Sequence, residues 1–181
     1  ESMAKALHRS TGIVLLLTII SIILYNRTSQ GLFLTLAITF GTTAYHFVMR
    51  LLVGGLFENI MHNHADYTRK WYQLRPWEKK FYAFCKVKKW KNKMPTYHPE
   101  RFSPDRYTWE EIAQTMCQSE LGHETIAVLS FLPIVSAKWF GALPVFVITS
   151  ICAAVFDLLF VMMQRYNRDR VVRMMKKKEK R

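Results

Sequence analysis

Residues 117–124 carry the side chains with the clearest potential for chemistry. On a helix, Ser119 and His123 share one face, and Glu120 lies three residues before His123. A carboxylate at this spacing can hold an imidazole in one tautomer and stabilise its cationic form. An imidazole held in this way is a candidate general base for a hydroxyl group. The alternative is a surface Glu/His pair on the last helical turn before an apolar segment.

A second polar stretch covers residues 164–170, after the last apolar segment. Asp157, Gln164 and Arg168 are spaced at i, i+7 and i+11, so a helix places them in one stripe that runs into that segment. We expect this stripe to face the protein interior and to contact substrate. Amide and guanidinium groups together suit sugar hydroxyls or phosphates.

An ionisable group inside an apolar segment is costly in free energy and usually has a partner. For Asp157 the candidates are Arg50 and His46, which lie in another apolar segment. A purely electrostatic alternative exists for the arginines of 164–170, which can anchor a helix end at a membrane surface. For the Lys/Arg-rich residues 173–181 we prefer that anchoring role.

Other motifs carry little weight. His62 and Asp66 have the H-x-x-x-D spacing of some acyl-CoA-dependent transferases, which we attribute to chance. His64 and His98 add no recognisable metal-ligand spacing, so no metal site is predicted. The three cysteines are widely spaced and predict neither a disulfide framework nor a zinc ribbon. No Gly-rich phosphate loop, G-x-S-x-G or H-E-x-x-H motif occurs.

Composition places these residues in a membrane protein. The 181-residue chain is half hydrophobic, and its 26 Lys+Arg outnumber 13 Asp+Glu. Apolar residues gather in long runs with cations between and after them, whereas soluble nucleic-acid-binding proteins interleave the two kinds. Abundant aromatic residues argue against disorder. The chain is predicted to be a small polytopic membrane protein with a basic aqueous face and no nucleic-acid partner.

The predicted fold is all-α, with about four transmembrane helices in a single membrane domain over residues 4–181. The predicted spans are 5–25, 32–57, 125–139 and 142–163. No small-residue cleavage site follows the first span, so we expect a retained anchor rather than a signal peptide.

The distribution of cations predicts the orientation in the membrane. The N-terminus, segment 58–124 and the basic tail 164–181 hold 23 of the 26 Lys and Arg residues, and the two short loops hold one each, Arg27 and Lys138. We therefore expect a multi-pass protein of the cell membrane with both termini and segment 58–124 in the cytoplasm.

Segment 58–124 contains a predicted amphipathic helix that begins at Pro76, a residue favoured at the first helical position. One side of this helix is apolar, and Lys79 and Lys86 fall on the opposite side. The apolar side comprises Trp77, Phe81, Phe84 and Cys85. This pattern is typical of a helix that lies in the membrane interface.

Two boundaries follow in the same segment. Met94 and Pro95 are expected to end the interfacial helix, since proline cannot continue it. Residues 108–111, Thr-Trp-Glu-Glu, have the pattern of a capping box. They predict the start of a helix that runs without a break into the span at 125–139.

Three blocks of sequence together resemble the glycosyl-4,4'-diaponeurosporenoate acyltransferase family, over about half of the chain from residue 71 onward. The blocks are 77–82 with 88–95, then 119–123, then 164–168, in the family's order. The resemblance implies a small integral membrane enzyme that esterifies a sugar hydroxyl of a glycosylated carotenoid with a fatty acyl group, as in staphyloxanthin-type pigments. This chain departs from the pattern at its first two spans, which elaborate a simpler anchor, and at Asp169, where a proline is expected.

The resemblance also implies roles for individual residues. It makes Glu120 and His123 the catalytic pair. It makes an interfacial wall of Trp77, Glu78, Tyr82, Trp90 and Lys91. It assigns the binding of polar substrate groups to Gln164, Arg165, Asn167 and Arg168.

Together these features predict an acyltransferase. His123 would deprotonate a sugar hydroxyl, Glu120 would orient the imidazole, and cationic donors would stabilise the oxyanion of the tetrahedral intermediate. The expected partners are the bilayer, a glycolipid acceptor, and acyl-CoA or acyl carrier protein as acyl donor, with no other cofactor. Ser119 is a candidate for a covalent acyl intermediate.

Two other functions stay open. The first is a non-enzymatic membrane anchor or scaffold whose aromatic and basic middle segment binds anionic lipid or a partner enzyme. The second is a different lipid-modifying enzyme that acts on a phospholipid or isoprenoid headgroup. A scaffold should tolerate His123→Gln and lose function gradually as the lysines of 79–93 are neutralised.

Overall fold

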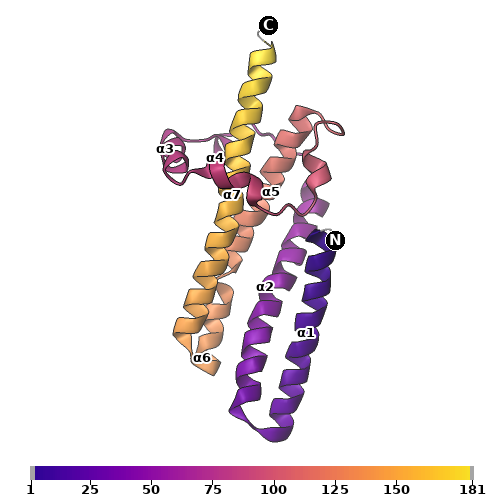
Figure 1. Cartoon of the computed structure of the whole chain (residues 1–181), viewed down its shortest axis with the longest axis vertical. Coiled ribbons are helices and arrows are strands. Elements are labelled where there is room, and N and C mark those ends of the chain that lie inside the picture. Colours follow the sequence, from indigo (N-terminus) through magenta and orange to yellow (C-terminus); the bar gives the residue numbers. More distant parts are fainter. Residues whose placement is uncertain (1–2, 180–181) are drawn as a thin grey trace.

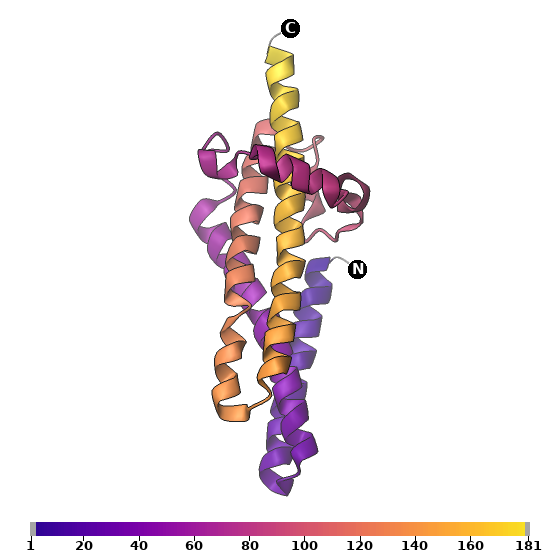
Figure 2. The same ribbon diagram turned by 90° about the vertical axis from the view of Figure 1, so that its left-hand side faces the viewer.

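The computed structural model describes residues 3–179, and every regular element in that range is a helix. The long helices α1 (Met3–Thr28) and α2 (Gly31–Met61) form one antiparallel hairpin. Helices α5 (Trp109–Leu129) and α7 (Leu143–Glu179) form the other pair, and α2 packs against α5 (Figure 1). In the view of Figure 2, α5 and α7 lie side by side, with the middle segment crossing them near one end.

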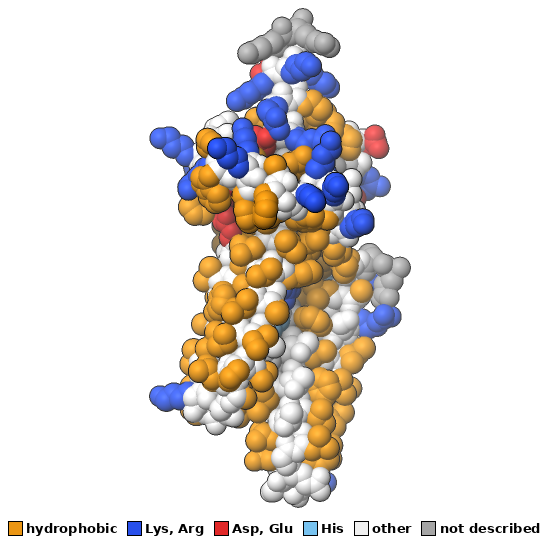
Figure 3. Space-filling view, turned by 60° about the vertical axis from the view of Figure 1, so that its left-hand side comes forward, with side chains coloured by type: hydrophobic (Ala, Val, Ile, Leu, Met, Phe, Trp, Pro, Cys, Tyr) orange, Lys and Arg blue, Asp and Glu red, His pale blue; other side chains and the backbone are white. Residues whose placement is uncertain are grey.

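Three helices, α1, α2 and α7, are long and apolar enough to cross a membrane. They contain the spans predicted at 5–25, 32–57 and 142–163. Many large apolar side chains of α7 point outward, namely Val145, Ile148, Ile151, Val155, Phe156 and Leu158. Lys and Arg side chains gather mainly at the end of the molecule that carries α3, α4 and the C-terminal part of α7 (Figure 3). This distribution is that of a membrane protein with one basic end.

The segment predicted as the third span, 125–139, is not one helix. Helix α5 ends at Leu129, and a 3₁₀ helix η4 (Leu132–Ser136) and the short α6 (Ala137–Phe140) complete the segment. The predicted helix runs without a break from its cap into this segment but ends at Leu129, because Pro133 lacks the N–H that an α-helix needs and tightens the chain into η4. The segment still runs back alongside α7 (Figures 1 and 2). A fourth crossing, cytoplasmic termini and a single membrane domain stay predictions.

The middle segment contains helix α3 (Pro76–Phe84), which begins at Pro76 as predicted. The backbone N–H of Arg75 donates to Glu78 Oε2 at 2.7 Å and caps its start. The helix does not continue to Met94 as predicted, since Lys86 adopts a left-handed conformation with φ +53°. Val87 is fully buried beyond this break and begins α4 (Val87–Trp90), which the 3₁₀ helix η2 (Lys91–Lys93) follows.

The two sides of α3 differ as the sequence suggested. Glu78 and Tyr82 are buried against the protein, whereas the exposed fractions of Trp77, Phe81 and Phe84 are 59 %, 46 % and 82 %. About half or more of each of these aromatic side chains is therefore left uncovered by the protein. A position in the membrane interface accounts for such a surface and stays a prediction.

Helix α5 starts with the predicted capping box. Thr108 Oγ1 accepts from the backbone N–H of Glu111 at 3.2 Å, and Glu111 Oε2 accepts from the backbone N–H of Thr108 at 2.7 Å. Beyond this cap, Ile112 and Met116 pack with Val171 of α7 in a buried apolar cluster. The basic residues after 164 are part of α7, which continues as helix to Glu179. The cap and the cluster fix where α5 meets α7.

Candidate functional site

Polar side chains of α5 and α7 meet along the contact between the two helices, which we call the α5–α7 seam. Gln164 Nε2 donates to Ser119 Oγ at 3.1 Å, and one turn further along α5, His123 Nδ1 lies 2.9 Å from Asp157 Oδ1. These two contacts come from antiparallel helices that each place a polar stripe toward the other. The inward position predicted for Asp157 and Gln164 is confirmed, since both are buried.

Asp157 is the centre of a polar cluster between α2, α5 and α7. Its side chain is fully buried, its Oδ1 faces His123, and its Oδ2 pairs with Arg50. Arg50, one of the two candidate partners, is thus the ion-pair partner of Asp157. A carboxylate only accepts hydrogen bonds, so His123 donates through Nδ1 and keeps the lone pair of Nε2 free. This is the tautomer that a general base requires.

The imidazole of His123 is also held by packing. It stacks on the ring of Phe160, one turn after Asp157, with centroids 4.5 Å apart and an interplanar angle of 5°. A quarter of the His123 side chain is exposed, so the ring is accessible to a reacting group. His46, one turn before Arg50 on α2, is buried and neither ring nitrogen has a partner among residues 3–179.

The prediction that Glu120 orients His123 is wrong. The Glu120 carboxylate is fully buried, accepts from Arg165 Nη1 at 2.6 Å, and forms an ion pair with Arg168 Nη2 at 2.5 Å. Two guanidinium groups on α7 outcompete a neutral imidazole for this carboxylate, while His123 turns to Asp157. The spacing of three residues brings the two side chains to one side of α5 but does not pair them.

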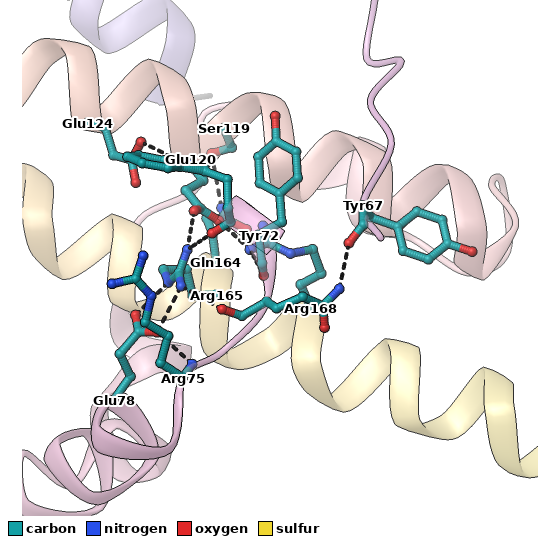
Figure 4. Close-up of polar contacts among 12 residues, drawn as sticks. Tyr67, Tyr72, Arg75, Glu78, Ser119, Glu120, Glu124, Gln164, Arg165 and Arg168 are labelled. Carbon is teal, nitrogen blue, oxygen red and sulfur yellow. Dashed lines mark hydrogen bonds and ion pairs between the residues drawn. The ribbon is translucent and has the colours of Figure 1, made fainter. Parts of the chain in front are cut away.

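Arg165 and Arg168 bind the segment 71–78, which we call the strap, to α7 (Figure 4). Arg165 donates to Glu78 Oε1 and Oε2 at 2.8 and 2.9 Å and to the backbone carbonyls of Trp71 and Gln73 at 2.8 and 3.0 Å.

Arg168 completes this attachment. It donates to the carbonyl of Tyr72 at 2.7 Å, and its guanidinium lies 5.1 Å from the centroid of the Tyr72 ring. Both arginines are buried and joined to protein groups. The geometry therefore makes them, with Glu120 and Glu78, a clamp that fixes the strap across the α5–α7 seam.

Several side chains of this region have displaced pKa values, among them Glu78, Tyr82 and Glu124. Burial raises the pKa of Glu78, but hydrogen bonds from Arg165 and from the Arg75 backbone outweigh it, so the pKa lies below the usual range. Burial raises the pKa of Tyr82 to about 12. Burial, with the neighbouring Glu120, also raises the pKa of Glu124, a half-buried carboxyl group that accepts from Trp71 Nε1 at 3.2 Å. Glu78 is thus held ionised and Tyr82 is held neutral.

The other residues implied by the resemblance divide into two groups. Lys91, Gln164 and Asn167 line one pocket of about 350 Å³. Trp77 is exposed on the outer side of α3, and Trp90 donates through Nε1 to the carbonyl of Cys85 at 3.0 Å. Sequence reasoning missed Phe160, although its position one turn after Asp157 places it on the same stripe and could have identified it.

Metal-ligating types are not brought together. Within residues 3–179, no three His, Cys, Asp or Glu side chains are placed to hold one metal ion. His98 pairs instead with Glu100, at 2.9 Å, and Asp66 accepts from the backbone of Thr68 at 3.0 Å. Residues 64–66 also line a pocket of about 450 Å³, together with Tyr72 and Gln114.

The fold and this site define a helical membrane protein with an ionised polar centre buried between its helices. Residues 68–177, more than half of the chain, match the family model described as glycosyl-4,4'-diaponeurosporenoate acyltransferase. The chain therefore belongs to this acyltransferase family, which confirms the resemblance of its sequence blocks. The matched region contains the strap, α5 and most of α7, whereas Arg50 lies outside it. No curated protein and no solved structure matches the chain significantly.

Proposed function

We propose that this protein is a membrane-bound acyltransferase that esterifies a sugar hydroxyl of a glycosylated lipid, of the carotenoid glycoside kind, with a fatty acyl group. The observation that carries the proposal is the contact between His123 and Asp157. It leaves Nε2 of an accessible imidazole free to accept a proton at the level of the apolar part of the molecule. The family description supports both the reaction and the kind of acceptor.

The reaction is an exchange of a thioester for an oxygen ester. His123 Nε2 takes the proton of the sugar hydroxyl as its oxygen attacks the acyl carbonyl carbon of the donor. The tetrahedral intermediate then expels the donor thiolate, and the imidazolium returns its proton to that sulfur. The products are the acylated glycolipid and the free thiol, and no covalent enzyme intermediate is needed.

Asp157 and Arg50 support this base. The Asp157 carboxylate fixes the imidazole and offsets the positive charge that His123 gains during the reaction. Arg50 is the counter-ion of this buried carboxylate. In this proposal its positive charge also favours the developing oxyanion. In this proposal Asp157 replaces Glu120 as the partner of the base, and Glu120 acts through Arg165 and Arg168.

The clamp and strap position the remaining wall of the site. Glu78 and Tyr82 are buried on the inner side of α3, so the clamp sets where Trp77 projects at the opposite side. We place Trp77 and Trp90 at the membrane interface on the cytoplasmic side, beside the glycolipid headgroup, whereas the buried Tyr82 supports this wall from within. The acyl and carotenoid chains stay in the bilayer against the apolar outer surface of α7.

The experiment is acyl transfer by purified protein in proteoliposomes that contain a glucosylated carotenoid and an acyl donor, with the ester product measured by mass spectrometry. His123→Gln should lower the rate by about 10²- to 10⁴-fold, since it removes the base but keeps a polar side chain. His98→Gln is the matched control, because this partly exposed histidine pairs with Glu100 and packs edge-on against the ring of Tyr97. A folded His123→Gln protein with full activity would overturn the role of the imidazole.

The exposed apolar side of α3 favours a second candidate, a scaffold that binds anionic lipid or a partner enzyme. In that case Trp77, Phe81 and Phe84 would carry the function, together with the nearby lysines. A scaffold predicts that His123→Gln is neutral and that Phe84→Ala is not. The two variants therefore separate the two functions in one assay of pigment or product in cells.

A further inference from the structure

The pocket of about 350 Å³ lies where η2 and the 3₁₀ helix η3 (Pro99–Phe102) meet the α5–α7 seam. Its lining combines two chemical types. The polar part comprises Lys91, Asn92, Gln164 and Asn167, and the apolar part includes Met116 and Met163. Asn167 has no hydrogen-bond partner within residues 3–179, so its amide is available to a ligand. The pocket therefore offers the amide of Asn167 beside flexible apolar side chains.

The position of the pocket relates it to the proposed base. Gln164 forms part of its wall and donates to Ser119, which lies one turn before His123 on α5. Asp157 lies seven residues before Gln164, so the pocket begins about 10 Å further along α7, toward the basic end of the molecule. The hydrogen bond from Gln164 to Ser119 therefore connects the wall of the pocket to the helix that carries His123.

The lining suits a slender chain that carries amides and ends in a phosphate. Asn167 and Gln164 can exchange hydrogen bonds with ligand amides, and methionines adapt to narrow flexible chains. Lys91 lies beside Tyr166, 5.9 Å from its ring centroid, and burial together with Arg170 lowers the pKa of this lysine. Lys91 therefore marks its part of the pocket wall as a site for a phosphate group.

Resting on the proposed function, we propose that this pocket binds the phosphopantetheine arm that acyl-CoA and acyl carrier protein share. The arm has two amides, a phosphate at one end and the acyl thioester at the other. In this proposal the phosphate lies at Lys91 and an amide of the arm at Asn167, so that the thioester extends past Gln164 toward His123. The acceptor approaches from the bilayer, where its apolar tail stays, so the two substrates meet at the imidazole from opposite sides.

Binding is measured on the full chain in lipid nanodiscs with coenzyme A as the probe. Asn167→Leu removes the amide at similar size and should weaken binding about fivefold to tenfold, and Lys91→Met should weaken it at least about tenfold. Asn26→Leu is the matched control, since this exposed asparagine lies at the far end of α1. In the transfer assay Asn167→Leu should raise the KM for the donor and leave the KM for the glycolipid unchanged.

A second comparison identifies the source of the arm. Holo acyl carrier protein differs from the apo form only by the arm, so tighter binding of the holo form assigns the pocket to the carrier protein. Tight binding of coenzyme A without this difference assigns it to acyl-CoA. Binding of neither, or equal binding to wild type and Asn167→Leu, overturns the proposal. Octyl glucoside serves as a probe for the sugar of the acceptor. If Asn167→Leu loses octyl glucoside binding but keeps coenzyme A binding, the proposal is overturned, because the pocket then belongs to the acceptor.

The failure of this proposal is distinguishable from the failure of the proposed function. His123→Gln should bind coenzyme A like wild type while acyl transfer is lost. Coenzyme A binding that depends on Asn167, in a wild-type protein without transfer activity, would refute the acyltransferase and keep the pocket. Transfer activity that is unchanged in both Asn167→Leu and Lys91→Met would refute the role of the pocket and keep the acyltransferase.

Discussion

His123 Nδ1 and Asp157 Oδ1 lie 2.9 Å apart and join α5 to α7 inside the apolar part of the molecule. The relationship assigns complementary roles to two side chains that are 34 residues apart in sequence. His123 is partly exposed and can reach a substrate, whereas Asp157 is buried and cannot. Asp157 therefore acts on a reaction through the imidazole and not by contact with the reacting atoms.

Asp157→Asn should lower kcat by about 10²- to 10⁴-fold with little change in the KM of either substrate. An amide can present its N–H to Nδ1 and select the wrong imidazole tautomer. Acyl-transfer kinetics in proteoliposomes measure the separate effects on kcat and KM. Ser150→Ala is the matched control, since Ser150 is also fully buried on the same side of α7 and its hydroxyl has no partner within residues 3–179. Equal losses in both variants would show a packing effect.

The effects of Arg50 and Asp157 on the free energy of unfolding should be coupled. Arg50→Met leaves a fully buried carboxylate without its counter-ion and should lower the free energy of unfolding by about 3 kcal/mol. The double variant Arg50→Met/Asp157→Asn removes the buried charge and should recover part of that loss. Thermal unfolding in detergent micelles measures all four proteins. Strictly additive effects would contradict the pairing.

Arg165 should control the order of the strap. Arg165→Met breaks hydrogen bonds to Glu78, Glu120 and two strap carbonyls, so we expect a loss of about 3 kcal/mol in stability and faster amide exchange over residues 71–78. Hydrogen exchange with mass spectrometry measures the second effect directly. Arg173→Met, which affects an exposed pair with Asp169 on the same helix, should leave strap exchange unchanged.

Because of Glu78, we expect the folded protein to lose stability in acid. Burial raises the pKa of this carboxyl group, but hydrogen bonds from Arg165 and the Arg75 backbone outweigh burial, so its pKa in the folded protein lies below the ordinary value of 4.5. As the pH falls, the unfolded chain therefore takes up a proton at Glu78 before the folded protein does. The stabilisation that this carboxylate provides above pH 4.5 is lost as the pH falls through the folded pKa. Wild type should lose melting temperature below pH 4.5 more steeply than Glu78→Gln.

The cause of this pH dependence can be tested in the same experiment. In the Arg165→Met background the difference between the Glu78 protein and the Glu78→Gln variant should shrink, since the main donor to the carboxylate is gone. Parallel curves of wild type and Glu78→Gln below pH 4.5 would contradict the shifted pKa. A difference that stays the same size after Arg165→Met would contradict its assigned cause.

Local rules predicted the starts of α3 and α5. The proline at 76 and the capping box at 108–111 act through the nearest backbone groups, so these two helix starts could be placed without the fold. The break at Lys86 was not predictable in this way, because no glycine or proline marks it. The burial of Val87 in the fold supplies its reason, and such a contact is not visible in a local pattern.

The candidate site was also predictable only in part. A carboxylate inside an apolar segment requires a partner, and Arg50 was one of two candidates for Asp157. The partner of His123 was misassigned because spacing shows only which side chains are neighbours on one helix. Which carboxylate the imidazole meets depends on competition from the guanidinium groups of α7, and that competition follows from the packing of α5 on α7.

The interfacial position of α3 gives the last prediction. Nitroxide labels are attached at Phe84→Cys and at Lys79→Cys, on opposite sides of the helix, in a chain whose three native cysteines are replaced by alanine. The Phe84 side is apolar and 82 % exposed at that residue, so its label should be in lipid and relax with oxygen. The label at Lys79 should be in water and relax with a nickel chelate. A label at position 84 that is more accessible to nickel than to oxygen would place α3 outside the membrane interface, and the apolar side of the helix would then need a protein partner to cover it.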